Sequence, residues 1–432
     1  MRMPFRILAV GLGIGSIVVS LSAQSGPTSA DSRTALAYEQ LAEAELALTR
    51  LNFAEARRIV DAWEESAATW KNYEPKEVVL DGWRGNRAAD IRFIASVFAE
   101  TTTPDELSTL FASRSAELFE RFLADGTTLL SPLSYPGLLI RGREDEAARG
   151  FERMATLLAG DPVRLFRLQA TRLSTLAGLG QRDLTIEQAA TKAALAAAPI
   201  EQVQTLAEYR GYLLTPVFQH ALAGDFAAAL DALRTALDAH PELPQRDRLE
   251  RYIPSLEKLI TLMPQEEALW AAESVELPRV TFETDRGPLE ITLFATDAPE
   301  SVANFIALVD AGFYDGVAFH RIVPHFVTQG GDPKGTGDGG PGYAIKREVG
   351  RHHARGSLGM ARDAAPDTAG SQFYFCLNAV SVHRLDGNYA VFGRVSAGLD
   401  VMDQLRLGDK IIRATVSRRG APLAPFTQLP ES

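Results

Sequence analysis

Apolar residues recur every three to four positions from about residue 33 to residue 272, in a stretch rich in Ala, Leu, Glu and Arg. This spacing places them on one face of successive helices, and alternating apolar and polar segments are almost absent. Glycines and prolines divide the stretch into segments of helix length, and the predicted breaks include Pro241 and Pro264. We therefore expect residues 33–275 to form an all-α domain.

One helical segment has a more specific pattern. Gly224 provides a turn, small alanines recur along the following helix, and Pro241 ends it. This resembles the second half of a tetratricopeptide repeat, and weaker matches to the same pattern begin at Asn52 and Gly142. The three matches are irregularly spaced along the chain. Stacked helical hairpins that bind a partner are one interpretation, and a spacer or dimerisation platform is the other.

The pattern changes after Glu273. Residues 280–284 and 289–293 alternate apolar with polar positions on either side of the turn Asp285-Arg286-Gly287-Pro288, which predicts a β-hairpin. Residues 299–312 then carry apolar side chains at helical spacing and begin with Pro299, a residue favoured at the first position of a helix.

Short strands and glycine turns follow as far as Val395, then a helix over 399–405 and a closing strand over 411–416. Many strands with two helices predict a closed antiparallel β-barrel over residues 278–417. A loosely held, Pro-rich tail is expected over 418–432. The predicted fold class is thus multidomain α and β, with the helical domain first and the barrel second.

The N-terminus has the order of a secretory signal peptide. Arg2 and Arg6 precede an apolar run over residues 7–21, which ends among small residues. The run is shorter than the roughly 20 residues that span a bilayer. We interpret residues 1–23 as a signal peptide and 24–32 as a linker, with an uncleaved anchor as the alternative. A periplasmic or secreted protein is expected, with no stable membrane span after processing.

Charge and cysteine content exclude some functions. The net charge of −11 and the pI near 5.3 argue against nucleic acid as a partner. Cys376 is the single cysteine, so an intrachain disulfide and a cysteine-based zinc site are both excluded. Cys376 lies among apolar residues, where a thiol usually behaves as a small buried hydrophobe.

A series of short strings in the C-terminal third points to one family. In chain order they are Ala298-Pro299 with Asn304-Phe305, Gly312-Phe313-Tyr314-Asp315-Gly316, Phe319-His320-Arg321-Ile322, Gln329-Gly330-Gly331-Asp332, Gly356-Ser357-Leu358-Gly359-Met360-Ala361, Gly370-Ser371-Gln372-Phe373, Leu385-Asp386-Gly387 and Val391-Phe392-Gly393. Through these strings, residues 279–416 resemble the cyclophilins, a family of peptidyl-prolyl cis-trans isomerases. The resemblance implies an eight-stranded barrel with a prolyl pocket on its outer surface and Arg321 as the catalytic residue.

The chemistry of prolyl isomerisation is consistent with an arginine in that role. Rotation about the prolyl peptide bond removes amide resonance, a barrier of about 18–20 kcal/mol, and returns a lone pair to the nitrogen. A guanidinium that donates to this nitrogen binds the twisted amide better than either planar form. A structural ion-pair role is the alternative for Arg321. We expect no cofactor and no metal.

The resemblance also implies the substrate-binding residues. Phe326, Val327, Tyr374 and Leu385 would hold the proline ring, Ala361 would line the neighbouring groove, and Gln329 and Gln372 would bind the substrate backbone; Tyr389 would pack beside them. Plain packing inside the barrel is the alternative for the aromatic members. Four positions depart from the best-known family pattern. This chain has Val327 where methionine is usual and Tyr374 where phenylalanine is usual. It has Arg384 in place of the usual tryptophan and Tyr389 in place of the usual histidine. Altered preference in the pocket is expected, and binding of cyclosporin-type inhibitors is in doubt.

Two further motifs are set aside. The glycine-rich segment 335–342 lacks the Lys-Ser/Thr end of a phosphate loop, and His352-His353 has no further ligand at helical spacing.

The sequence predicts an exported isomerase that assists the folding of proline-containing, unfolded or flexible segments. The alternative is a proline-peptide-binding or assembly scaffold with little turnover, in which the helical domain leads partner binding.

Overall fold

The computed structural model describes residues 53–68, 134–272 and 276–430, together with scattered residues between 41 and 123. These residues divide into two compact units. One comprises residues 173–189 and 200–430, and the other comprises the described residues up to 172 together with residues 190–199. The predicted signal peptide and linker lie outside the described residues.

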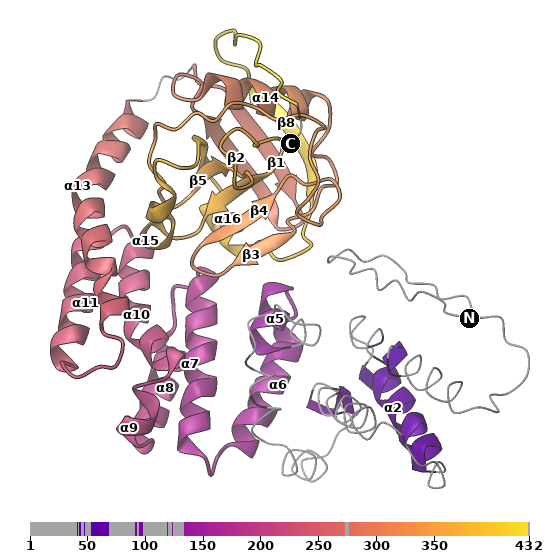
Figure 1. The fold of residues 1–432 in the computed structure, drawn as a ribbon, viewed down its shortest axis with the longest axis vertical. Helices are drawn as coiled ribbons and strands as arrows, with labels where there is room; N and C mark the ends of the chain where they lie inside the picture. The colour runs from indigo at the N-terminus through magenta and orange to yellow at the C-terminus, as the bar shows by residue number, and fades with distance from the viewer. Residues whose placement is uncertain are drawn as a thin grey trace, which may run out of the picture. The chain divides into compact units, whose positions relative to one another are not determined.

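Helices account for the regular structure before residue 273, as predicted. They are α2 (Phe53–Ala68), α5 (Tyr135–Ile140), α6 (Glu144–Leu157), α7 (Pro162–Gly178), α8 (Thr185–Ala197), α9 (Ile200–Val203), α10 (Ala207–Leu222), α11 (Phe226–Ala239), α12 (Asp247–Glu250) and α13 (Tyr252–Ala271) (Figure 1). The prediction of an N-terminal all-α region is confirmed for the residues that the structure describes.

The turn predicted at Gly224 joins α10 to α11. Gly224 has a φ of 83°, which glycine adopts without a steric penalty, and the side chain of Asp225 accepts a hydrogen bond from Ala228 N at 2.9 Å. The apolar face of α11, with Phe226 and Leu233 among its buried residues, packs along α10. The hairpin is therefore present, and its membership of a tetratricopeptide array stays a prediction.

The prediction that a helix ends at Pro264 was wrong, because α13 continues through this residue to Ala271. A proline inside a helix removes one backbone hydrogen bond and costs about 3 kcal/mol. Burial of Leu256, Leu259 and Met263 on one side of α13 offsets that cost. The helix survives because tertiary packing outweighs local propensity.

The C-terminal region contains one eight-stranded antiparallel sheet, in the order β3-β4-β6-β5-β7-β2-β1-β8. Its strands are β1 (Arg279–Thr284), β2 (Gly287–Leu293), β3 (Arg321–Val323), β4 (Val327–Gly330), β5 (Ser357–Met360), β6 (Phe373–Cys376), β7 (Val391–Ala397) and β8 (Ile411–Arg418). The predicted hairpin is confirmed by β1 and β2, whose register pairs Thr284 with Gly287.

The prediction of a closed barrel was wrong, since the sheet curls into a half-barrel with β3 and β8 at its two edges. Residues at or just before the starts of these strands do approach each other. Phe319 N donates to Asp409 O at 2.8 Å and Ile411 N donates to Val317 O at 2.9 Å, around a single bridge between Ala318 and Lys410. The segments that precede β3 and β8 pair at this single bridge only, which is too short for a β-ladder, because β3 begins after it.

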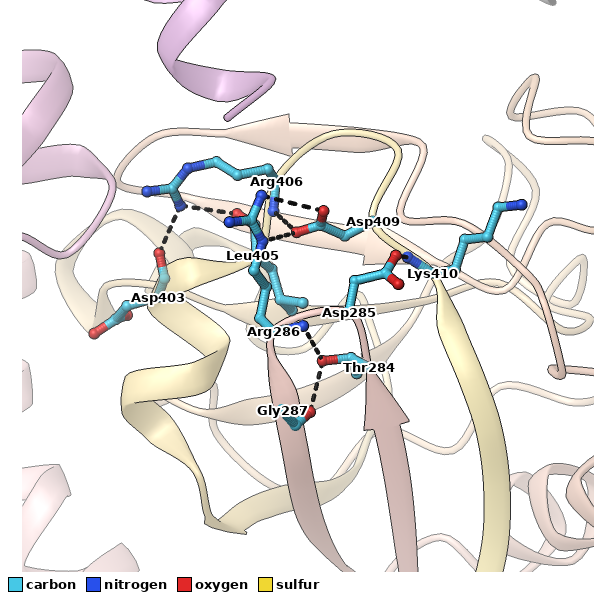
Figure 2. A network of polar contacts seen from close by, with 9 residues as sticks. All are labelled: Thr284, Asp285, Arg286, Gly287, Asp403, Leu405, Arg406, Asp409 and Lys410. Carbon is cyan, nitrogen blue, oxygen red and sulfur yellow. Dashed lines mark hydrogen bonds and ion pairs between the residues drawn. The ribbon is translucent and has the colours of Figure 1, made fainter. Parts of the chain in front are cut away.

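A polar network fixes the segment that makes this bridge (Figure 2). The guanidinium of Arg286, in the β1–β2 turn, lies 2.7 Å from Asp409 Oδ2, which also accepts a hydrogen bond from Arg406 N at 2.7 Å. Asp285 accepts from Lys410 N at 2.7 Å. The turn predicted from residues 285–288 therefore holds the segment before β8 in place.

Aromatic side chains fill the core of the half-barrel. Phe282 lies at the centre of a cluster with Phe305, Tyr314, Phe373 and Phe375, with ring centroids between 5.6 and 6.5 Å from its own. Phe305 comes from α14 (Pro299–Asp310), which contacts β7 and β8. Both predicted helices are present as α14 and α16 (Leu399–Gln404); α15 (Ala379–Val382) and the 3₁₀ turn η2 (His383–Leu385) were not predicted.

The expectation of a loosely held tail was also wrong. Leu429 and Ala344 exchange two backbone hydrogen bonds, of 2.7 and 2.9 Å, and the ring of Phe426 lies 5.8 Å from that of Tyr343. A high proportion of proline in a segment indicates the absence of regular secondary structure, not the absence of packing.

Within the described residues, no helix is long and apolar enough to span a membrane.

Candidate active site

Three neighbouring strands bring the predicted polar residues together. The register pairs Arg321 of β3 with Gln329 of β4, and Gln329 with Tyr374 of β6. Arg321 Nη1 donates to Gln329 Oε1 at 3.2 Å, and Gln329 Nε2 donates to Gln372 Oε1 at 2.9 Å. Directly paired residues in adjacent strands point to the same face. The result is a hydrogen-bonded row of Arg321, Gln329 and Gln372.

A glycine-rich loop holds the far end of this row. Gln372 Nε2 donates to the carbonyls of Gly337 and Gly339 at 2.7 and 2.9 Å. The loop's own N–H groups turn inward to Asp332, which accepts from the backbone of Thr336 and Gly337, among others. Burial would raise the pKa of Asp332, but these donors outweigh it and lower the pKa. The loop supports the row and does not form a phosphate cradle.

The predicted apolar residues form one cluster beside the row. Val327, Tyr374, Cys376 and Val382 are buried at its centre, and Phe326, Ala361, Leu385 and Tyr389 pack against them while remaining partly exposed. The Ala361 amide donates to Gln372 O at 2.9 Å, which joins the cluster to the row. All the substrate-binding residues predicted from sequence are thus brought together. Cys376 is fully buried, as expected, and burial raises its pKa well above the usual value.

Arg321 lies at the exposed end of the row. Partial burial and the neighbouring charge of Arg384 both lower its pKa, yet a guanidinium that starts above 12 remains charged at physiological pH. Within the part of the chain that the structure describes, no carboxylate lies within ion-pair distance of Arg321. A structural ion pair, the alternative considered for this residue, is therefore not seen among the described residues.

The hydroxyl of Tyr374 finds a partner that the sequence did not reveal. It lies 2.9 Å from Nε2 of His353, whose Nδ1 lies 2.8 Å from Asp386 Oδ1. With the imidazole proton on Nδ1, toward the carboxylate, Nε2 accepts the hydrogen bond from the tyrosine. Tyr374 is thus held through a buried histidine by an aspartate 12 residues further along the chain.

Asp386 also gathers the other histidines of this region. Its carboxylate accepts from His352 Nδ1 at 2.9 Å, from His383 Nδ1 at 3.1 Å and from the backbone N–H of His353 at 2.8 Å. Burial alone would raise the pKa of Asp386, but the hydrogen bonds from His353, His383 and His352 hold it well below its usual range. The His352-His353 pair therefore orients a carboxylate; in the described residues, no group of metal-ligating side chains is suited to hold an ion.

The turn between β3 and β4, which carries Phe326, contacts the end of α7. His325 N donates to Gly178 O at 2.8 Å, and His325 Nε2 lies 3.0 Å from Ser174 O. Burial lowers the pKa of His325 to about 4, in spite of the bond to the carbonyl. Sequence gave no signal for this histidine, because its partners lie about 150 positions earlier in the chain.

Comparison with known proteins assigns the family. Residues 279–423 match the family model described as cyclophilin type peptidyl-prolyl cis-trans isomerase/CLD. A peptidyl-prolyl cis-trans isomerase of Helicobacter pylori is 47% identical over 136 residues, which cover 30% of this chain and 82% of that protein. The chain belongs to the cyclophilin-type peptidyl-prolyl isomerase family. Peptidyl-prolyl cis-trans isomerase B of Bacillus subtilis is 47% identical over 128 residues, 29% of this chain and 87% of that protein.

Among solved structures, a Cryptosporidium parvum cyclophilin crystallised with the dipeptide Ala-Pro covers 32% of this chain and 98% of its own, at 30% identity and a TM-score of 0.30. The cyclophilin domain is a peptidyl-prolyl isomerase, as predicted. The family match begins at residue 279, so the helical residues before it lie outside the match.

Proposed function

We propose that Arg321 catalyses isomerisation by donating a hydrogen bond to the prolyl nitrogen of the twisted amide. Planar amides offer no lone pair at nitrogen, so this interaction exists only near the transition state, and it lowers the barrier for that reason. Gln329 accepts from one N–H of the guanidinium at 3.2 Å and orients the remaining donors. This observation carries the proposal. The step breaks no covalent bond and moves no proton.

The apolar cluster supplies the second requirement, a site that holds the proline ring while the preceding carbonyl turns. We infer that Phe326, Val327, Tyr374 and Leu385 contact the ring, and that Tyr389 packs beside it. Gln329 and Gln372 would hydrogen-bond the substrate backbone, with Ala361 beside the flanking residue. A fixed ring with a positioned donor converts binding energy into a lower barrier.

The test is turnover of a proline tetrapeptide by the full chain. Arg321→Ala should lower kcat/KM by a factor on the order of 10² to 10³, the loss typical when one transition-state donor is removed. Arg413→Ala removes an exposed arginine from β8 and serves as the matched control. Equal rates for the Arg321→Ala variant and the unchanged chain would overturn the role of Arg321, and the Arg413→Ala variant should keep full activity.

We also infer that the protein acts in an exported compartment, on the basis of the charged, apolar and small-residue order of residues 1–23. Expression of the full sequence, followed by mass measurement of the mature N-terminus, tests this inference. The expected result is cleavage near residue 23, which removes the segment that precedes it. An intact N-terminus in the cell interior would contradict it.

A further proposal concerns the helical region, which we infer binds folding clients. Ile186 on α8 is 78% exposed, and Ile200 and Leu269 are about half exposed, so large apolar side chains of this region are available to contact a client. Ile186→Glu should slow the catalysed refolding of a proline-limited protein and leave tetrapeptide turnover unchanged. If both rates stay the same, Ile186 takes no part in client binding.

A further inference from the structure

Two rings at the exposed side of the apolar cluster each lie beneath a guanidinium. Arg384 Cζ lies 4.4 Å from the ring centroid of Phe326, and Arg362 Cζ lies 4.5 Å from that of Tyr389. Both distances are well inside the range of about 6 Å for cation–π contact. Phe326 and Tyr389 belong to the cluster proposed to hold the proline ring. The arginines therefore stand at the edge of the proposed substrate site.

The charges of these arginines are not paired with carboxylates in the part of the chain that the structure describes. In the described ranges, no aspartate or glutamate lies within ion-pair distance of Arg321, Arg362 or Arg384. Asp386 is only two positions from Arg384, but its oxygens accept from three imidazoles and one backbone N–H. Arg321, Arg362 and Arg384 thus place positive charge at the edge of the proposed site, although the chain as a whole has a net charge of −11.

Arg362 and Arg384 differ in the hydrogen-bond donors that they can offer a ligand. The guanidinium of Arg362 donates to the backbone carbonyls of Asn388, Asp363 and Ala364, so its geometry is fixed and its donors are engaged. Arg384 is exposed, and its contact in the structure is the face of the Phe326 ring. Stacking fixes the plane of its guanidinium and leaves the N–H edge open to an anion.

We propose that Arg384 selects proline segments that carry an acidic side chain beside the proline. The inference rests on the proposed prolyl site. With the pyrrolidine ring against Phe326, residues one or two positions away follow at about 3.8 Å per step, which brings their side chains within reach of Arg384. Carboxylates match the fork of a guanidinium bidentately. The charges of Arg321 and Arg362 add to the field that attracts them.

The experiment compares three tetrapeptides that differ only in the residue before proline, which is Glu, Gln or Lys. With the full chain at ~0.01 M salt, kcat/KM for the Glu peptide should exceed that for the Gln peptide by about fivefold and that for the Lys peptide by more, and ~1 M salt should erase the order. Arg384→Gln should bring the Glu-to-Gln ratio close to one. Arg384→Glu should reverse the order in favour of Lys.

Arg413→Ala, on exposed β8, is the matched control and should keep the ratios of the unchanged chain. Equal rates for all three peptides in the unchanged chain would overturn the proposal, as would a Glu preference that survives Arg384→Gln. Both results require measurable turnover of the Gln peptide. Absence of turnover for every peptide would contradict the proposed prolyl site instead, so the two failures are distinguishable.

Discussion

The imidazole of His325 stacks on the ring of Phe218, with centroids 4.4 Å apart and planes inclined by 30°. Phe218 belongs to α10, and His325 occupies the β3–β4 turn with a φ of 63°, a conformation that is uncommon for a residue other than glycine. Phe326 follows directly. Helical residues therefore hold, by ring stacking and two hydrogen bonds, the turn that presents one side of the prolyl site.

Truncation of this histidine should weaken both stability and substrate binding. His325→Ala removes a half-buried ring that stacks on Phe218 and is expected to cost about 2–3 kcal/mol of unfolding free energy. Loss of the stacking contact should also shift Phe326 and raise KM roughly tenfold, with a smaller change in kcat. Urea denaturation and tetrapeptide kinetics on the full chain measure the two effects.

Leu233→Ala provides the control, because Leu233 is fully buried on α11. Its stability loss should be similar, about 2–5 kcal/mol for a leucine truncated in a core, while KM should stay unchanged. A KM for His325→Ala equal to that of the unchanged chain would show that the turn does not position Phe326.

Acid should destabilise the protein through the same residue. The folded-state pKa of His325 is about 4, whereas the unfolded value is about 6.5, so the neutral imidazole stabilises the fold fully above pH ~6.5. That stability is lost as the pH falls through the folded pKa, and the loss approaches about 3 kcal/mol below pH ~4.

His325→Phe keeps a ring over Phe218 and cannot be protonated. The difference in unfolding free energy between this variant and the unchanged chain should therefore shift in favour of the variant as the pH falls from ~7 to ~4. Other groups titrate in both proteins and cancel in the comparison. A difference that is constant with pH would exclude His325 as the responsible group.

Gly359 should not tolerate a side chain. A Cβ at this position of β5 would lie 2.3 Å from Cζ of Tyr374, its partner in the sheet register. Gly359→Ala must displace the tyrosine, and we expect a stability loss of about 1–3 kcal/mol and a clear drop in kcat/KM. Gly350→Ala is the matched control, since a Cβ there meets no atom within 4 Å. Equal activity of the two variants would contradict the close packing of Gly359 on Tyr374.

Tyr374→Phe tests the hydrogen bond to His353. Removal of the hydroxyl leaves a buried imidazole nitrogen without its partner, and the expected loss is about 1–3 kcal/mol of unfolding free energy. In a second variant, His353→Phe, the tyrosine hydroxyl loses its acceptor in turn. If the double variant is as stable as the sum of the single losses predicts, the two groups are not coupled in solution.

Local patterns in the sequence determined much of this protein. The β1–β2 hairpin followed from two alternating segments around a glycine turn, and α14 followed from Pro299 and an apolar face at helical spacing. Both depend on interactions between residues close in the chain. The family strings, with their fixed order, likewise led to Arg321, Gln329 and Tyr374, which the sheet register then brought side by side.

Tertiary structure alone decided the remainder, because the interactions concerned join residues with no periodic relation in the chain. His325 meets Phe218 across more than 100 positions, Asp386 gathers His352 and His353, and α13 runs through Pro264 because its buried face outweighs the proline penalty. The open edge between β3 and β8 depends on where two distant strands begin. Spacing in a sequence records the period of a helix or strand, whereas such contacts depend on how the elements pack.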